Sequence, residues 1–214
     1  MPTLLLRLAG PLQSWGIRSK FEIRTTENEP TKSGVIGMIA AALGRRRDEP
    51  IDDLNCMRFG VRADRPGVLL RDFHTAKTVK TSYVTYRDYL SDAVFLAGLE
   101  SDDKELLNKI EYALKNPAFS LFLGRRSCPP TLPVFWGIRE CSLLEALRKE
   151  PPLMRTEHNN ADKMYIRYDA ASGRAVKHDV PVSFDIKHRK YGYRYENEEW
   201  IQAAFDEHDP MAEL

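Results

Sequence analysis

The sequence is poor in cysteine and contains no long hydrophobic segment. Its 214 residues include three cysteines, none of them in a C-x-x-C pair. An odd, widely spaced set argues against a disulfide framework and against a structural zinc site. The longest apolar run, Val35 to Leu43, is about half of what a membrane-spanning helix needs. We therefore expect reduced thiols, no cofactor or metal, no membrane segment and a cytoplasmic protein.

The sequence also lacks a strong net charge, but its charges are unevenly distributed. The net charge is +1, which does not indicate a nucleic-acid binder. From Glu196 to Leu214, however, there are seven acidic residues and no Lys or Arg. The preceding 195 residues hold all 32 basic residues against 24 acidic ones, a net charge of +8. The body of the chain is therefore positive and only its end is acidic.

Several basic residues are clustered, and one cluster contains tyrosines. The clusters are Arg45–Arg47, Lys77 with Lys80, Arg125 with Arg126, and 187–190 with Arg194, next to Tyr191, Tyr193 and Tyr195. Arg and Lys neutralise phosphates and aromatic rings stack on unpaired bases, so this mixture suits single-stranded nucleic acid. A solvated strand with alternate residues facing water explains the last cluster equally well.

Hydrophobic periodicity predicts a mixed α/β order. We expect strands at 3–9, 58–63, 68–73, 92–99, 119–123 and 132–138, and helices at 31–44, 101–116 and 142–149. The segment 63–67 is a plausible hairpin connection between two of these strands. The resulting βαββαβ order is typical of a ferredoxin-like, RRM-like α+β domain.

Residues after Pro151-Pro152 predict a smaller β-rich part. We place the N-terminal domain at 1–140 and a small C-terminal β-rich domain, with the acidic tail, at 141–214. Within the tail, Trp200, Ile201, Ala204 and Phe205 have helical spacing and predict a docked helix. Trp15, among apolar neighbours, is expected in the core rather than as a base-stacking platform.

Five motifs occur in an order that points to a known family. They are Leu-Arg-Leu-Ala-Gly-Pro-Leu-Gln-Ser-Trp-Gly (6–16), Pro-Thr-Lys-Ser-Gly-Val-Ile-Gly (30–37), Arg-Asp-Phe-His-Thr (71–75), Tyr-Arg-Asp-Tyr-Leu-Ser-Asp-Ala (86–93) and Leu-Gly-Arg-Arg-Ser-Cys-Pro (123–129). Together they resemble the CasD subunits of type I-E CRISPR Cascade complexes, members of the RAMP superfamily.

The resemblance implies a fold and a set of partners. It implies a ferredoxin-like RAMP domain, a β-hairpin thumb at about 74–91 and a small C-terminal β domain. It also implies a non-catalytic subunit that holds the 5′ handle of the CRISPR RNA in antiviral defence. The implied partners are the backbone subunit CasC, the large subunit CasA and, indirectly, target DNA near its PAM-proximal end. The thumb interval from His74 to Arg87 is short in this sequence, which predicts a stub.

The same resemblance selects the candidate RNA-binding residues. They are Arg24, Lys32, Ser33, His74, Lys77, Lys80, Tyr83, Arg87, Arg125, Arg126 and Ser127. Lys32 and Ser33 begin a helix, whose free N–H groups suit a phosphate, although Ser33 could simply cap it. Arg125–Ser127 occupy a turn, where they either contact RNA or are merely solvated.

Two other function classes remain open. A metal-independent endoribonuclease could draw on His74, Lys77 or Lys80, and Tyr83, because such cleavage needs a base, an acid and a cation. The sequence contains no P-loop and no H-x-x-x-H pattern. A protein-binding adaptor would explain the acidic tail but would leave the positive body without a role.

Overall fold

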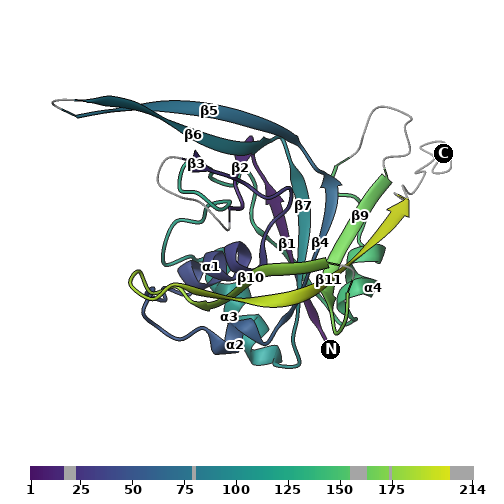
Figure 1. The fold of residues 1–214 in the computed structure, drawn as a ribbon. Coiled ribbons are helices and arrows are strands. Elements are labelled where there is room, and N and C mark those ends of the chain that lie inside the picture. Colours follow the sequence, from purple (N-terminus) through teal and green to yellow (C-terminus); the bar gives the residue numbers. More distant parts are fainter. Residues whose placement is uncertain (17–22, 79–80, 155–162, 174, 203–214) are drawn as a thin grey trace.

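A computed structural model describes residues 1–16, 23–78, 81–154, 163–173 and 175–202. Within these ranges seven strands form one antiparallel sheet, in the order β10-β11-β9-β4-β7-β1-β8 (Figure 1). Their bounds are β1 Thr3–Ala9, β4 Arg58–Arg65, β7 Val94–Glu100, β8 Phe135–Arg139, β9 Lys163–Ala170, β10 Ala175–Ser183 and β11 Lys190–Gln202. A smaller sheet contains β2 Leu12–Gln13, β3 Ile23–Arg24, β5 Val68–Lys77 and β6 Ser82–Ser91.

Strand β1 is an inner strand between β7 and β8 and is covered on both faces, which explains its run of leucines. Leu4, Leu6 and Leu8 belong to the larger core cluster, whereas Leu5 belongs to a second cluster on the opposite face of the sheet. A strand buried on both faces needs apolar residues at every position rather than at alternate ones. The N-terminal run is therefore a core strand, as the sequence predicts.

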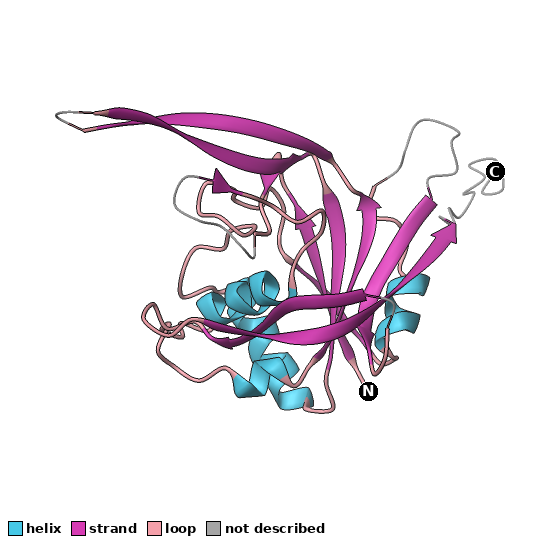
Figure 2. Cartoon of the chain, viewed as in Figure 1, coloured by secondary structure: helices cyan, strands magenta, loops and turns pink. Residues whose placement is uncertain are grey.

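The helices cover the two faces of the sheet in separate groups (Figure 2). Helices α1 (Lys32–Ala42), α2 (Asp52–Asn55) and α3 (Lys104–Lys115) lie on one side, and α4 (Leu143–Lys149) lies on the other. Side chains cap the two longer helices: the Thr31 hydroxyl, not that of Ser33, accepts from the Gly34 amide, and the Asp103 carboxylate accepts from the Leu106 amide. No helix in the described ranges is long and apolar enough to cross a membrane.

The expected hairpin between 58–63 and 68–73 is wrong. Strand β4 pairs with β7 on one edge and with β9 on the other, so it has no free edge for β5. Strand β5 instead leaves the main sheet and pairs with β6. The strand expected at 119–123 is also absent from this described segment, in which the backbone forms bends before the turn at 124–127.

The helix predicted from the spacing of Trp200 and Ile201 is wrong as well. Both residues lie in β11, where Trp200 is opposite Tyr165 and Ile201 is opposite Met164. Backbone pairing with β9 outweighs the helical spacing of the side chains. Ala204 and Phe205 lie outside the described residues.

The C-terminal strands β9, β10 and β11 extend the main sheet. Strand β9 pairs with β4, so residues from both sides of the boundary expected at 140 share one set of backbone hydrogen bonds. The sheet is continuous across residue 140, so it does not by itself separate two domains. The division therefore stays a proposal about folding units.

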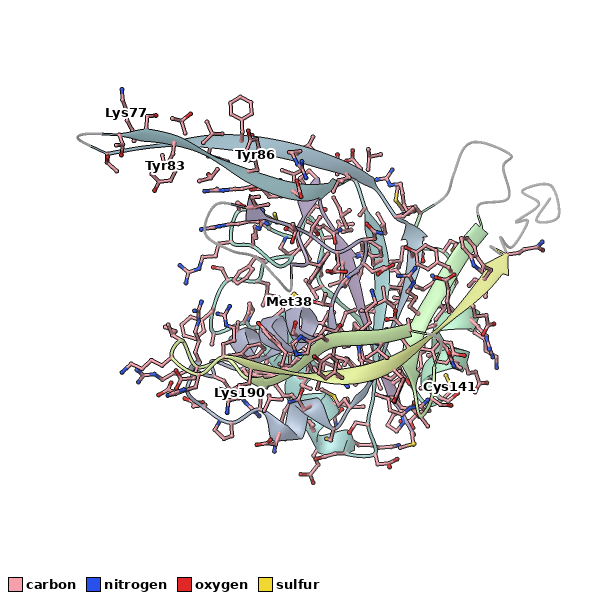
Figure 3. The ribbon with its side chains drawn as sticks, in the orientation of Figure 1. Met38, Lys77, Tyr83, Tyr86, Cys141 and Lys190 are labelled. Atoms are coloured by element: carbon pink, nitrogen blue, oxygen red, sulfur yellow. The ribbon has the colours of Figure 1, made fainter. Side chains whose placement is uncertain are left out.

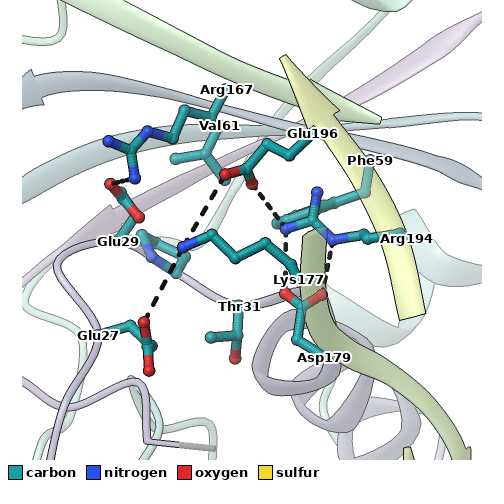
Figure 4. Close-up of a pocket in the computed structure, with 11 residues that line it drawn as sticks. Glu27, Glu29, Thr31, Phe59, Val61, Arg167, Lys177, Asp179, Arg194 and Glu196 are labelled. Atoms are coloured by element: carbon teal, nitrogen blue, oxygen red, sulfur yellow. Dashed lines mark hydrogen bonds and ion pairs between the residues drawn. The ribbon is translucent and has the colours of Figure 1, made fainter. Parts of the chain in front are cut away.

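A buried ionic cluster fixes these C-terminal strands to helix α1 (Figure 4). The Arg194 guanidinium donates to Asp179 Oδ1 at 2.6 Å and to Asp169 Oδ1 at 2.9 Å. Asp179 Oδ2 also accepts from the first amide of α1, that of Lys32, at 2.9 Å. Lys32 Nζ in turn reaches Asp169 at 3.0 Å. One set of charges therefore joins β9, β10, β11 and the helix N-terminus.

The charged states in this cluster are set by burial and by its internal pairs. Burial opposes the charge on Arg194, but its hydrogen bonds to Asp179 and the charge of Asp169 outweigh burial and raise its pKa. Burial raises the pKa of Glu196, against the opposing effect of Arg194 and Lys177. Glu196, whose carboxylate lies 2.9 Å from the Arg194 guanidinium, thus belongs to the same cluster, and burial disfavours its charged form.

We predict that Asp179→Ala destabilises the protein by about 3–5 kcal/mol, because it leaves the buried Arg194 charge without its main partner. It also removes the acceptor for the first helical amide. Urea unfolding of the variant and the wild type measures the change. The exposed Asp102, which no ion pair engages among the described residues, provides the control Asp102→Ala, expected within about 0.5 kcal/mol of wild type. Equal effects of the two substitutions would contradict this role for Asp179.

We also predict that the unfolding free energy of the Glu196→Gln variant increases relative to that of the wild type as pH rises. The folded-state pKa of Glu196 is raised, so the folded chain binds this proton more tightly than the unfolded chain does. That stability is complete below the unfolded pKa of about 4.3 and is lost as pH rises through the folded pKa. Unfolding free energies at pH values from about 4 to 7 should show the difference moving toward the variant. A constant difference would refute the assignment.

Candidate nucleic-acid interface

The most prominent feature outside the main sheet is a long hairpin made by β5 and β6 (Figure 1). The strands pair from Val68 opposite Ser91 to Lys77 opposite Ser82, and we call residues 68–91 the hairpin arm. The sequence predicts a stub beginning at residue 74. The structure corrects this, because 68–73 are the first half of the arm rather than a strand of the main sheet.

The register divides the arm into two faces. Directly opposite residues of an antiparallel pair share a face. One face, called the lower face, carries Leu70, Asp72, His74, Ala76, Tyr83, Thr85, Arg87 and Tyr89. The upper face carries Leu69, Arg71, Phe73, Thr75, Lys77, Ser82, Val84, Tyr86, Asp88 and Leu90. Figure 3 shows Tyr83 and Lys77 projecting from opposite sides of the arm. Two predicted RNA-binding residues thus point in different directions.

Three predicted residues converge at the base of the arm. Arg87 comes from β6, and Arg24 lies opposite it on β3 in a parallel pair. Arg125 comes from the turn after residue 123, and its Nη2 donates to the Arg24 carbonyl at 2.8 Å. Its guanidinium carbon lies 4.9 Å from the centre of the Tyr89 ring, a cation–π contact. We call Arg24, Arg87 and Arg125 the arginine cluster.

The arginine cluster has donors without acceptors. Arg87 Nε and Arg125 Nη1 are buried, and neither has a hydrogen-bond partner among the described residues. No carboxylate of the described chain forms an ion pair with Arg24, Arg87 or Arg125, in contrast to Arg71, whose Nε is 2.7 Å from Asp88. Unsatisfied buried donors are costly. An anion bound here would relieve this cost, and a phosphate matches the planar donor geometry of arginine.

The turn that carries Arg125 is held by a glycine. Gly124 has φ +83°, and a Cβ at this position would collide with the Ser14 carbonyl oxygen. This close packing leaves Arg126 and Ser127 exposed beside the arginine cluster. Cys128 is buried, and burial raises the pKa of its thiol, so it is not a reactive thiolate.

Three predicted residues lie farther along the arm. His74 is exposed on the lower face, and its Nε2 lies 2.7 Å from Asp72 Oδ2. Tyr83 is on the same face with half of its surface exposed, 50%. Lys77 is exposed on the upper face, close to the turn. Lys80 lies outside the described residues.

Lys32 and Ser33, the other predicted RNA-binding residues, lie in the first turn of α1 and not on the arm. Both are buried, and the Lys32 ammonium binds Asp169 and the Met57 carbonyl, the latter at 2.8 Å. The helix N-terminus, which the sequence suggests as a phosphate site, already holds the Asp179 carboxylate. The sequence also groups Arg194 with the basic residues 187–190. The structure corrects this grouping, because the Arg194 side chain is only 9% exposed.

Sequence reasoning missed the role of Tyr89. Its ring supports the Arg125 guanidinium and is itself 5% exposed. The alternation of a strand places Arg87 and Tyr89 on one face, so the pair could have been recognised from their spacing. The contact between Tyr89 and Arg125, which is 36 positions away on a turn, could not have been recognised from the sequence. Trp15, by contrast, is a core residue as expected, 1% exposed and hydrogen-bonded to Gln13.

Comparison with known proteins places this arrangement in a family. The family model described as CRISPR-associated protein (Cas_Cas5) matches residues 3–195. The CRISPR system Cascade subunit CasD of Escherichia coli (strain K12) is 36% identical over 161 residues, which are 65% of this chain and 72% of CasD.

Two solved structures match nearly the whole fold. One, described as a CRISPR RNA-guided surveillance complex, has a chain with 35% identity and a TM-score of 0.79, covering 98% of this chain and 96% of that one. Another, described as the crystal structure of a Cas protein, has 42% identity and a TM-score of 0.77, with 94% and 95% covered. The chain therefore belongs to the Cas5 family of CRISPR-associated proteins.

Proposed function

We propose that this chain is a non-catalytic, RNA-binding subunit of a type I-E CRISPR surveillance complex, in which it holds the 5′ handle of the CRISPR RNA. Its relatives are the Cascade subunit CasD and a chain of an RNA-guided surveillance complex. The observation that carries the proposal is the arginine cluster, whose two buried donors have no acceptor among the described residues. In this proposal, phosphate oxygens of a bent RNA backbone are the acceptors for these donors.

The arm continues this site away from the body. Arg87 stands on the lower face, and His74 and Tyr83 follow on the same face toward the turn. Cations near the base would hold phosphates while Tyr83 stacks on a base, the combination used for single-stranded RNA. Arg126 and Ser127 extend the same surface from the neighbouring turn. In this proposal the arm is the thumb implied by the family resemblance.

The proposed RNA-binding domain is ferredoxin-like. The chain order β1-α1-β4-β7-α3-β8 and the sheet order β4-β7-β1-β8 both support this arrangement. The domain division at 140 is part of the same proposal. The fold does not specify the function, which rests on the arginine cluster.

The arm also supports contacts with neighbouring subunits. Val68, Leu69 and Phe73 are exposed to 71%, 59% and 67%. Exposed apolar side chains gathered on one hairpin are typical of a surface that another protein covers. We propose the backbone subunit CasC and the large subunit CasA as neighbours. Target DNA would be an indirect partner, with its PAM-proximal end near this subunit. The complex would act in the cytoplasm.

The runner-up function is metal-independent cleavage of CRISPR repeat RNA. His74 and Tyr83 do share the lower face, which such chemistry would need. The cation would be Lys77 or Lys80. Lys77 is on the upper face, away from His74 and Tyr83, and Lys80 lies outside the described residues. The position of Lys77 favours a binding role over a catalytic one.

We predict that Arg87→Gln weakens binding of CRISPR RNA carrying its repeat-derived 5′ segment by about 10- to 150-fold, because a charge-assisted hydrogen bond is worth about 1.5–3 kcal/mol. The slope of log affinity against log salt should fall by about 0.7 for the lost phosphate contact. Fluorescence anisotropy over a salt series measures both. Arg47→Gln, at an exposed arginine after α1, makes the same charge change away from the arm and should leave the affinity close to wild type. An unchanged slope for Arg87→Gln would remove this residue from the RNA site.

We predict no site-specific cleavage when the purified protein is incubated with its repeat RNA, with or without EDTA. Denaturing gels of end-labelled RNA would reveal products. Cleavage at one position that His74→Ala abolishes, while RNA affinity is retained, would establish the nuclease function instead.

A further inference from the structure

A second surface combines aromatic rings with positive charge, and it is separate from the hairpin arm. On β11, Tyr191, Tyr193 and Tyr195 alternate with Arg194 and so lie on the face opposite the ionic cluster. Tyr193 is 72% exposed and Tyr195 is 49% exposed. Helix α4 covers this side of the sheet over β4, β7 and β1, and it reaches the far half of β11 at Glu199. Among the described residues, no helix covers this side of β10 and β11 around the exposed Tyr193.

The rings on this surface are held in position by the neighbouring strand. The His178 ring stacks on Tyr193, with centroids 4.3 Å apart and planes at 22°. His178 Nε2 also lies 3.0 Å from the Tyr191 carbonyl oxygen. Val176, 59% exposed, stands opposite Tyr195. Tyr193 and Tyr195 are two residues apart on one strand, about 6.7 Å along it, so each can accept a different planar group.

Positive charge lies at the end of the same two strands. Lys187, Arg189 and Lys190 are exposed in and beside the connection from β10 to β11, where Figure 3 labels Lys190. None of these cations has an ion-pair partner in the described part of the chain, whereas Arg148, beside the far half of β11, is paired with Glu199. The one carboxylate in the connection, Asp185, accepts the Lys187 amide at 2.7 Å.

We infer that the face of β10 and β11 is a second binding surface for single-stranded RNA, with Tyr193 and Tyr195 stacking on bases and the connection 187–190 binding phosphates. Flat rings on an open sheet match the faces of bases, and unpaired cations next to them match the backbone. An acidic protein partner would also match the cations, but the spacing of Tyr193 and Tyr195 along one strand matches successive bases of an unpaired RNA more directly. The occupant is a segment of the RNA that the arginine cluster does not hold, so the inference rests on the proposed function.

The test uses the full-length protein and a 12-nucleotide uridine RNA that carries one central 2-aminopurine. Stacking on an aromatic side chain quenches 2-aminopurine fluorescence. Tyr193→Ala and Tyr195→Ala should each reduce the quenching and weaken binding by about 5- to 100-fold. Tyr193→Phe, which keeps the ring, should bind like wild type. Tyr112→Ala removes an equally exposed tyrosine, 70%, from α3 and serves as the matched control.

The charge contribution is measured separately. Replacing Lys187, Arg189 and Lys190 by Gln should lower the slope of log affinity against log salt by about 2, since each phosphate contact contributes about 0.7. Because all three side chains are exposed, thermal unfolding should be unchanged.

The outcomes separate this inference from the proposed function. If Arg87→Gln weakens RNA binding and the tyrosine variants do not, the arginine cluster stands and the second surface is refuted. If the tyrosine variants weaken binding and Arg87→Gln does not, the second surface stands and the proposed site is wrong. Equal losses for Tyr112→Ala and Tyr193→Ala would also refute the inference. So would a Tyr193→Ala protein that binds RNA normally but no longer joins the other subunits.

Discussion

The structure depends on the way Arg194 is neutralised. This arginine lies under the C-terminal strands, bound to Asp179 and Asp169, and Asp179 also accepts the first amide of α1. A buried charge is tolerated only with well-placed partners, so the positions of β9, β10, β11 and α1 are linked through one guanidinium. Two further pairs, Lys177 with Glu27 and Arg167 with Glu29, attach the segment between β3 and α1 to the same strands. That segment follows Arg24, so the ionic cluster around Arg194 also supports the base of the proposed RNA site.

The two groups of arginines illustrate opposite uses of the same side chain. Arg194 has carboxylates on several sides and is fully engaged inside the protein. Arg87 and Arg125 are partly buried as well, yet each keeps a donor without an acceptor among the described residues. The first arrangement neutralises the arginine inside the fold, and the second leaves donors that a bound anion would satisfy in the proposed function. Donors that the protein has ordered in advance would make such binding stronger.

The hairpin arm and the open face of β10 and β11 have different relations to the core. The arm contacts little of the body beyond its base, where Tyr89 and Leu90 are buried, and its distal apolar side chains are exposed. It is therefore suited to reach a partner but contributes little to the stability of the isolated chain. Tyr193 and Tyr195, by contrast, stand on a strand that Arg194 fixes from behind through Asp179 on β10 and Asp169 on β9. If both proposals hold, the sheet with its exposed rings and the projecting arm would make two kinds of contact along one RNA.

The sequence by itself determined the local elements and the family. Short-range chemistry predicts a strand from the leucines of 3–9 and helix starts near Thr31 and Asp103, and the structure has this strand and these helices. The order of the motifs indicates the family. Tertiary structure decided which strands pair and which charges are free. Residues 68–73 have the same strand propensity in either sheet, and only the occupied edges of β4 send them into the arm. Lys32, Arg194 and Arg125 are indistinguishable as isolated cations. Their surroundings depend on how segments pack. Lys32 meets Asp169, 137 positions away, and Arg194 meets carboxylates of the neighbouring strands, whereas the acceptors for Arg125 among the described residues are backbone carbonyls such as that of Arg24, 101 positions away.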